Sequence, residues 1–164
     1  MYKPAHHWLW DFWTLHDGEQ FHLFYLQAPD QLAHPEQRHV RARIGHAKSK
    51  DLLNWEEQGE IFGPSSDAAS LEAANSEAEW DSRCTWTGSV IASQHVKAEA
   101  KYALLYTGTN EAEGSEIQRI GLAWSDDLQQ FNRAEPSLVL EHDATYYLGR
   151  NPHHALSLIH ISEP

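Results

Sequence analysis

The chain repeats a stretch of its own sequence, and this repeat limits the possible folds more than any other feature. FHLFYLQAP at 21–29 matches YALLYTGTN at 102–110. IGHAKSKDLLNW at 44–55 matches IGLAWSDDLQQF at 120–131, and both copies share Ile, Gly, Ala, Ser, Asp and Leu at matching places. The spacing between the two pieces differs from one copy to the other only by a five-residue loop change. The chain therefore contains two copies of one structural unit.

Each copy is predicted to be β structure. Residues 21–26, 86–93 and 102–107 are short aromatic and aliphatic runs bounded by Gly, Pro, Asn or polar residues, which is typical of strands. An antiparallel unit of four strands that recurs, and that cannot bury both faces alone, is typical of a propeller blade. The predicted fold class is therefore all-β, with two propeller blades visible in the sequence.

A Ser-x-Asp-Leu piece closes each copy, at 49–52 and at 125–128. Short polar side chains in such a piece bond to nearby backbone amides and form a turn between two strands. Asp51 and Asp127 are therefore assigned to the scaffold rather than to catalysis.

The repeat predicts how the chain is divided. Blade one takes 1–62, an inserted surface loop 63–79, blade two 80–135, the start of a third blade 136–155, and a tail 156–164. The insertion is polar and rich in Ala and Ser, with room for a helical turn. The tail, LSLIHISEP, resembles the translated transposase adapter of shotgun sequencing libraries, and we interpret it as an artefact. Its alternation also fits a final strand.

Composition excludes several classes of partner. The 24 Asp and Glu residues against 12 Lys and Arg give a formal net charge of −12, which argues against binding to nucleic acid. No apolar run approaches the roughly 20 residues of a membrane span, and no signal peptide is visible, so we expect a cytoplasmic protein that does not bind membranes. The lone Cys84 and the adjacent His pairs show no metal-ligand spacing, so neither a metal nor a cofactor is expected.

Several motifs in order resemble one enzyme family. These are WDFW at 10–13, FHLFYLQAP, GHAKSKDLLNW at 45–55, and WTGS at 86–89 followed by LLYTG. Together they resemble the first two blades of the five-bladed β-propeller glycosidases that act on fructosides, the invertase, levansucrase and fructanase group of glycoside hydrolase families 32 and 68. The likeness covers about residues 8 to 135. It implies a carbohydrate substrate and a chain that carries only about the first two of five blades.

The resemblance implies roles for particular residues. Asp11 matches the family's nucleophile, because glycoside hydrolysis needs a carboxylate at the anomeric carbon and a second carboxyl to protonate the leaving oxygen. A structural alternative is that Asp11 caps a turn. Aromatic rings provide stacking surface for sugars, although burial in a β core explains most Trp residues. The implied substrate-binding residues are Trp10, Trp13, Gln27, Asp81, Trp86 and Ser89, of which Ser89 is expected to bond to the nucleophile or to a sugar hydroxyl.

One departure from the family pattern bears on activity. The family's transition-state stabiliser lies in an Arg-Asp-Pro motif and its acid in a later blade, whereas this chain has Arg150-Asn151-Pro152 and no fourth blade. We therefore expect a fructoside hydrolase or fructosyl transferase of the retaining type whose present chain is inactive. Two alternatives stay open: a related propeller glycosidase acting on arabinosides, xylosides or mannosides, and a non-catalytic sugar-binding propeller.

Overall fold

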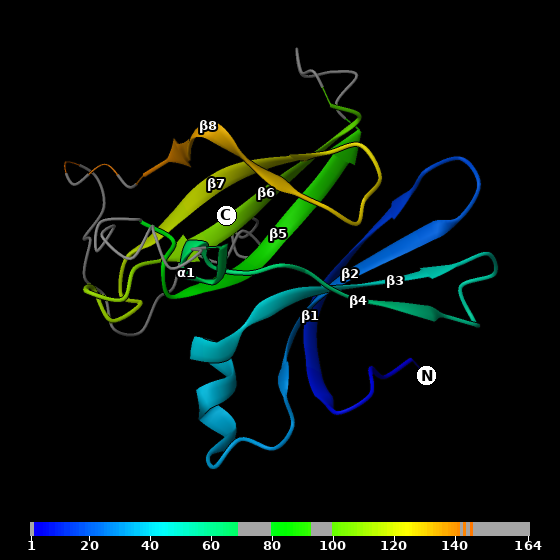
Figure 1. The fold of residues 1–164 in the computed structure, drawn as a ribbon, viewed down its shortest axis with the longest axis horizontal. Helices are drawn as coiled ribbons and strands as arrows, with labels where there is room; N and C mark the ends of the chain where they lie inside the picture. Colours follow the sequence, from blue (N-terminus) through cyan, green and yellow to red (C-terminus); the bar gives the residue numbers. More distant parts are fainter. Residues whose placement is uncertain (1, 69–79, 93–99, 142, 144, 146–164) are drawn as a thin grey trace.

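Two antiparallel β-sheets make up the protein in a computed structural model, which describes residues 2–68, 80–92, 100–141, 143 and 145 (Figure 1). The first sheet has the order β1-β2-β3-β4 and the second the order β5-β6-β7-β8. The all-β prediction and the prediction of two four-stranded units are both confirmed. The strands of the first sheet are β1 (His7–His16), β2 (Phe21–Pro29), β3 (Arg43–Ser49) and β4 (Glu56–Phe62), with a 3-10 helix η1 (Pro35–Arg41) between β2 and β3.

The second sheet follows after a short helix, α1 (Ser65–Ala68). Its strands are β5 (Cys84–Ala92), β6 (Tyr102–Thr109), β7 (Gln118–Ser125) and β8 (Asn132–Leu140). The sequence division ended the second unit at 135, but β8 continues to Leu140, because Leu138 and Leu140 pair with β7. Residues 69–79 and the tail at 156–164 lie outside the described residues. Among the described residues, no helix has the length and apolarity needed to cross a bilayer.

The two predicted turns have the same geometry. The Oδ1 atom of Asp51 accepts hydrogen bonds from the amides two and three residues later at 2.9 and 2.8 Å, and that of Asp127 does so at 2.8 and 2.9 Å. The next residue is left-handed in both copies, with φ of 62° at Leu52 and 63° at Leu128. These bonds lower the pKa of Asp51 and Asp127 below the usual range, because ionised oxygens accept them best. The scaffold role of both carboxylates is confirmed.

A tyrosine lies over a glycine of the neighbouring strand in each sheet. A Cβ atom on Gly45 would lie 2.5 Å from the ring of Tyr25, and one on Gly121 would lie 2.6 Å from the ring of Tyr106. The glycine of the repeated Ile-Gly pair is therefore needed for this close approach.

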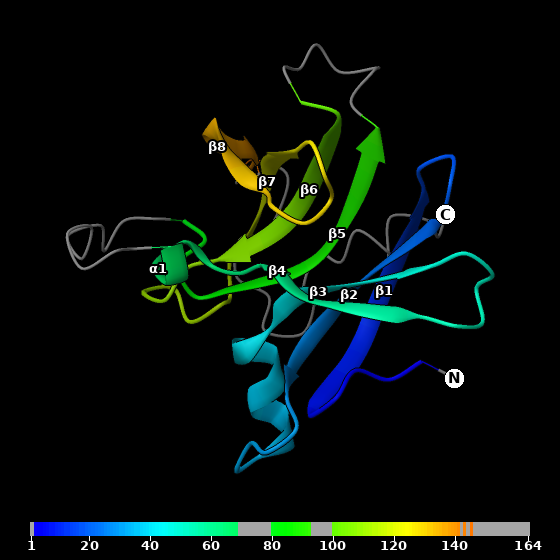
Figure 2. The same ribbon diagram turned by 45° about the vertical axis from the view of Figure 1, so that its right-hand side comes forward.

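The main hydrophobic core lies between the two sheets, which Figure 2 shows one against the other. Even-numbered residues of β2 point toward the second sheet, as strand alternation requires. We call this the rear face of the first sheet. The second sheet packs against it. The buried core residues are Phe24, Leu26, Ile44 and Phe62 from the first sheet, and Val90, Leu104, Tyr106, Ala123, Leu128 and Phe131 from the second sheet and its turn.

Candidate functional site

The first strand of each sheet contains a β-bulge at the same place in the repeat. The pairing of β1 with β2 shifts between Trp10 and Phe12, and that of β5 with β6 shifts between Trp86 and Gly88. The extra residues are Asp11 and Thr87, whose separation along the chain equals that between the repeated segments 44–55 and 120–131. Asp11 has a φ of 35°, a backbone state that Asp tolerates better than most residues. Bulges re-aim side chains, and they are common next to active sites.

The two bulged side chains bond to each other. The Oγ1 atom of Thr87 donates a hydrogen bond of 2.8 Å to Oδ2 of Asp11, in an exposed position where β1 and β5 make contact. The other carboxylate oxygen, Oδ1, stays available to another partner, and the Asp11 side chain is exposed. The interpretation of Asp11 as a turn cap does not fit, because Asp11 lies in the middle of β1. The family motif pointed to Ser89 and not to Thr87, although the repeat spacing from Asp11 leads to Thr87.

Ser89 lies elsewhere on β5. It is exposed and pairs with Leu105, on the face of the second sheet that points away from the first. The expected bond from Ser89 to the nucleophile is therefore wrong, because strand alternation turns its side chain to the opposite face.

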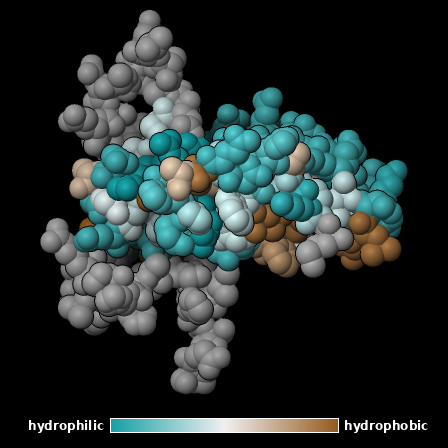
Figure 3. Space-filling view, turned by 90° about the horizontal axis from the view of Figure 1, so that it is seen from below, coloured by the Kyte–Doolittle hydropathy of each residue, from teal (hydrophilic) through white to brown (hydrophobic). Residues whose placement is uncertain are grey.

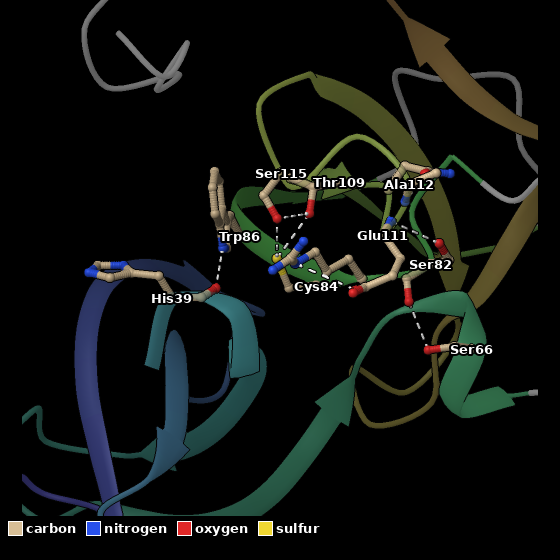
Figure 4. Close-up of polar contacts among 11 residues, drawn as sticks. His39, Ser66, Ser82, Cys84, Trp86, Thr109, Glu111, Ala112 and Ser115 are labelled. Atoms are coloured by element: carbon tan, nitrogen blue, oxygen red, sulfur yellow. Dashed lines mark hydrogen bonds and ion pairs between the residues drawn. The ribbon is translucent and has the colours of Figure 1, made fainter. Parts of the chain in front are cut away.

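Two half-buried tryptophans flank the Asp11–Thr87 pair, one from each repeat. Trp10 contacts the ring of His39 edge-on, with 6.1 Å between centroids. The indole Nε1 of Trp86 donates a 2.7 Å hydrogen bond to the backbone carbonyl of His39 (Figure 4). His39 belongs to η1, so this helix fixes both rings beside the carboxylate. Both tryptophans were predicted from the sequence to bind substrate, whereas η1 was not predicted.

Gln27 is buried, and Trp13 is half-buried against the main core. Trp13 stacks on Phe24 at 6.2 Å between centroids, and its indole nitrogen is buried without a partner in the described part of the chain. Gln27 is buried beside Gly45, and its Oε1 atom also has no partner there. The contacts of Trp13 therefore support a role in packing rather than in sugar binding.

Asp81 is in the core rather than at a sugar site. Its side chain is 1% exposed, and its Oδ2 atom accepts 2.8 Å bonds from the Tyr106 hydroxyl and from Nε of Arg133. Arg133 also donates to the carbonyl of Gly63, and its guanidinium lies 4.5 Å from the Phe62 ring centroid. These contacts give Asp81 a structural role, because both of its partners belong to the packed interior and its buried side chain presents no surface to a sugar hydroxyl.

A buried chain of hydrogen bonds links Asp17, His22 and His46. The Nε2 atom of His22 lies 3.0 Å from the Asp17 carboxylate, and its Nδ1 atom lies 2.9 Å from Nε2 of His46. Because the carboxylate only accepts, Nε2 of His22 carries the proton of that hydrogen bond. Burial and the neighbouring His22 lower the pKa of His46 to about 3. These three linked side chains were not predicted from the sequence.

Other polar groups have local partners. Cys84 is buried 3.0 Å from the Thr109 hydroxyl, in a cluster that Figure 4 shows with Ser115. Burial raises the pKa of its thiol, so it is not an activated nucleophile. Glu141 bonds to Arg119 at 2.7 Å. Within the described ranges, no group of three or more His, Cys, Asp or Glu side chains is arranged to hold a metal ion.

Comparison with known proteins identifies the family. Residues 2–155 match the Glycosyl hydrolases family 32 N-terminal domain. This chain belongs to glycosyl hydrolase family 32. The match agrees with the resemblance inferred from the motifs, and it makes carbohydrate the substrate class of the family. A comparison with curated proteins returns no significant match.

Solved structures show the same fold. A glycosyl hydrolase from Bacteroides ovatus has a TM-score of 0.53 at 16% identity, covering 76% of this chain and 30% of that one. A candidate glycoside hydrolase from Parabacteroides distasonis has 0.54 at 19%, covering 76% and 31%. A structure described under the GH130 family of mannoside phosphorylases, which contains hydrolases of β-1,2 mannosidic linkages, has 0.52 at 20%, covering 77% and 31%. The family 32 chain thus spans about 30% of the length of these structures.

Proposed function

We propose that this chain provides the nucleophile-bearing part of a retaining glycosidase that acts on β-fructosides such as sucrose or fructans. One observation supports this most directly. Asp11 lies in a motif that resembles the one carrying the family's nucleophile. Its carboxylate is accessible on a bulge and accepts a hydrogen bond from Thr87. The match to a glycosyl hydrolase family supports a role for this carboxylate in glycoside cleavage.

The chemistry needs two carboxyl groups about 5 to 5.5 Å apart. In the first step the Asp11 carboxylate attacks the anomeric carbon, while the bond to the leaving oxygen breaks and that oxygen takes a proton from a carboxylic acid. In the second step the resulting carboxylate deprotonates water, which attacks the same carbon and frees Asp11. If another sugar hydroxyl replaces this water, the reaction is fructosyl transfer.

Thr87 and the two tryptophans have distinct roles in this proposal. The Thr87 hydroxyl fixes one carboxylate oxygen, so that the other faces the anomeric carbon. Trp10 and Trp86 offer aromatic surface for the sugar ring, and the carbonyl of His39 sets the orientation of Trp86. Asp11 and Thr87 occupy corresponding positions of the two repeats, as do the two tryptophans, so the site depends on the contact between β1 and β5.

Candidates for the second carboxyl within this chain have other roles or lie outside the described residues. Asp81 is buried with Arg133, and Glu141 is bonded to Arg119. Glu79 lies outside the described residues. We therefore propose that the acid comes from protein beyond this chain, in agreement with a chain that spans 30% of a solved neighbour.

The substrate is tested in a longer protein that contains these residues and has the length of the solved neighbours. Released sugar is measured with sucrose, levan and inulin, and with arabinosides, xylosides and mannosides, for the parent, Asp11→Asn and Glu19→Gln. Glu19 is an exposed carboxylate in the β1–β2 turn and serves as the matched control. The proposal expects fructoside cleavage that falls by about 10³-fold or more only in Asp11→Asn. Cleavage of mannosides alone would instead favour the GH130-like alternative.

A further inference from the structure

The connection that contains η1 is longer than the repeat requires. In the first repeat it covers 30–42, between β2 and β3, whereas the corresponding connection of the second repeat covers 110–117, between β6 and β7. The difference is the five-residue loop change that separates the two copies in the sequence. The second sheet forms the same arrangement of four strands without these residues, so the strands do not need η1.

η1 does not add to the hydrophobic core either. None of its seven residues is buried. Figure 3 views the molecule from the side on which η1 lies in Figure 1, and most of the described surface in that view is hydrophilic. Helices in proteins are stabilised mostly by burial of an apolar face, and η1 buries none. The reason for this helix therefore lies in the contacts that it makes beside the candidate site.

η1 connects the two sheets through one residue, His39. The helix lies against β2 of the first sheet and β5 of the second. The imidazole of His39 contacts the Trp10 ring on β1 at 74° between the ring planes, and its backbone carbonyl accepts the hydrogen bond from Trp86 on β5. One residue thus sets the orientation of both rings, next to the contact that joins Asp11 to Thr87.

Contacts within η1 hold the His39 side chain in place. The carboxylate of Glu36 lies 3.5 Å from Nε2 of His39 and accepts a 3.4 Å hydrogen bond from Arg38. Arg38 also donates to the carbonyl of Pro35 at 3.1 Å. Exposed ion pairs of this kind add little to overall stability, so we assign them to the orientation of the side chains. η1 therefore presents the His39 ring to the tryptophans as a preformed unit.

We propose that His39 is a positioning residue for sugar binding, and that the five-residue extension of the first repeat serves to place it. The inference rests on the proposed function, in which Trp10 and Trp86 offer their rings to the sugar. Rings that are already fixed lose less freedom when a ligand binds. Because His39 acts through the tryptophans and not on the reacting atoms, it strengthens binding of the substrate and of the transition state equally. Such uniform binding changes KM and leaves kcat unaltered.

Steady-state kinetics of the longer protein test the inference, with whichever glycoside the parent cleaves. His39→Ala removes the imidazole but keeps the carbonyl that binds Trp86. KM should rise about three- to tenfold, as expected for loss of one aromatic pair, while kcat stays within about twofold of the parent. His39→Phe again places a ring edge beside Trp10 and should return KM to the parent value. His34→Ala is the matched control and should not change KM, because His34 is exposed and makes no side-chain capping bond to η1.

A second measurement does not depend on catalysis. Nitrogen-15 NMR spectra of this chain contain the indole signals of seven tryptophans. His39→Ala should shift the signals of Trp10 and Trp86, and His34→Ala should leave both in place. The inference is overturned if His39→Ala shifts neither signal, if its KM equals that of the parent, if kcat falls as much as KM rises, or if His39→Phe does not restore KM. Failure of the proposed function differs from these results, because a preference for glycosides other than fructosides changes the assay substrate but not the expected KM ratio.

Discussion

At the residue scale, the candidate site is a pair of bulged side chains rather than a single motif. Asp11 could be selected from sequence because its neighbours resemble a family motif. Thr87 could not be selected in that way, because the neighbouring Ser89 looked equally able to donate a hydrogen bond. Only the bulge in β5 decides between them, since it turns Thr87 toward Asp11 and leaves Ser89 on the opposite face.

Replacing Thr87 tests this pairing. In the longer active protein, Thr87→Val keeps the shape of the side chain but removes the hydroxyl that binds the carboxylate. A hydrogen bond to a charged group is worth about 1.5 to 3 kcal/mol, so kcat should fall by about tenfold to a hundredfold. Thr87→Ser retains the hydroxyl and should recover most of the activity. Equal kcat in Thr87→Val and the parent would show that the bond does not position Asp11.

His46 makes a pH-dependent contribution to stability. An unfolded His46 titrates near pH 6.5, whereas burial and His22 hold the folded pKa at about 3. Between these values the unfolded chain binds the proton and the folded chain does not. The free energy of unfolding therefore falls as the pH drops from 6.5 toward 3, by about 1 kcal/mol per pH unit.

The second repeat provides the control for this effect, because Leu122 lies at the position that corresponds to His46. Urea unfolding at pH 7, 6 and 5 should show a steeper loss of stability in the parent than in His46→Leu. Parallel pH profiles for the two proteins would contradict the assignment.

At the element scale, the join between the two sheets depends on one buried ion pair. Asp81 precedes β5, while its partners Tyr106 and Arg133 lie on β6 and β8, and Arg133 reaches back to Gly63 after β4. The carboxylate thus connects the end of the first sheet to three strands of the second.

Asp81→Ala should destabilise the chain strongly. It leaves the Arg133 guanidinium in a partly buried position without its carboxylate, and loss of one member of a buried pair costs about 3 to 5 kcal/mol. Chemical unfolding of the parent and of Asp126→Ala, an exposed carboxylate in the turn after β7, gives the comparison. A loss below about 1 kcal/mol for Asp81→Ala would mean that Arg133 finds another partner.

Elements with a periodic sequence signal could be predicted, and those defined by long-range partners could not. The strands around FHLFYLQAP and YALLYTGTN follow from apolar runs, and the two Asp turns follow from local bonds to backbone amides. Asp81 was assigned to sugar binding because nothing local shows that Arg133, 52 residues away, would bury it. The end of β8 was also missed, because Leu138 and Leu140 are defined by their pairing with β7.

At the scale of the whole molecule, the site is open, and the residues that the structure describes supply one candidate carboxylate to it, Asp11. We expect the 164-residue chain by itself not to hydrolyse sucrose, levan or inulin. Without an acid the leaving oxygen departs unprotonated, which costs about 10²- to 10⁴-fold in rate. Released sugar is compared with that from Asp11→Asn. Turnover above this control would mean that the acid lies within the chain, and Glu79 would be the first candidate.

The most direct test of the account is to identify the residue that becomes attached to the sugar. A longer protein that contains this chain is mixed with an activated fructoside and quenched in acid within its first turnovers, and its peptides are analysed by mass spectrometry. The account predicts one added fructosyl group on the peptide that contains Asp11, and none in Asp11→Asn. A sugar attached to a different carboxylate, or turnover by the Asp11→Asn variant at the parent's rate, would contradict it.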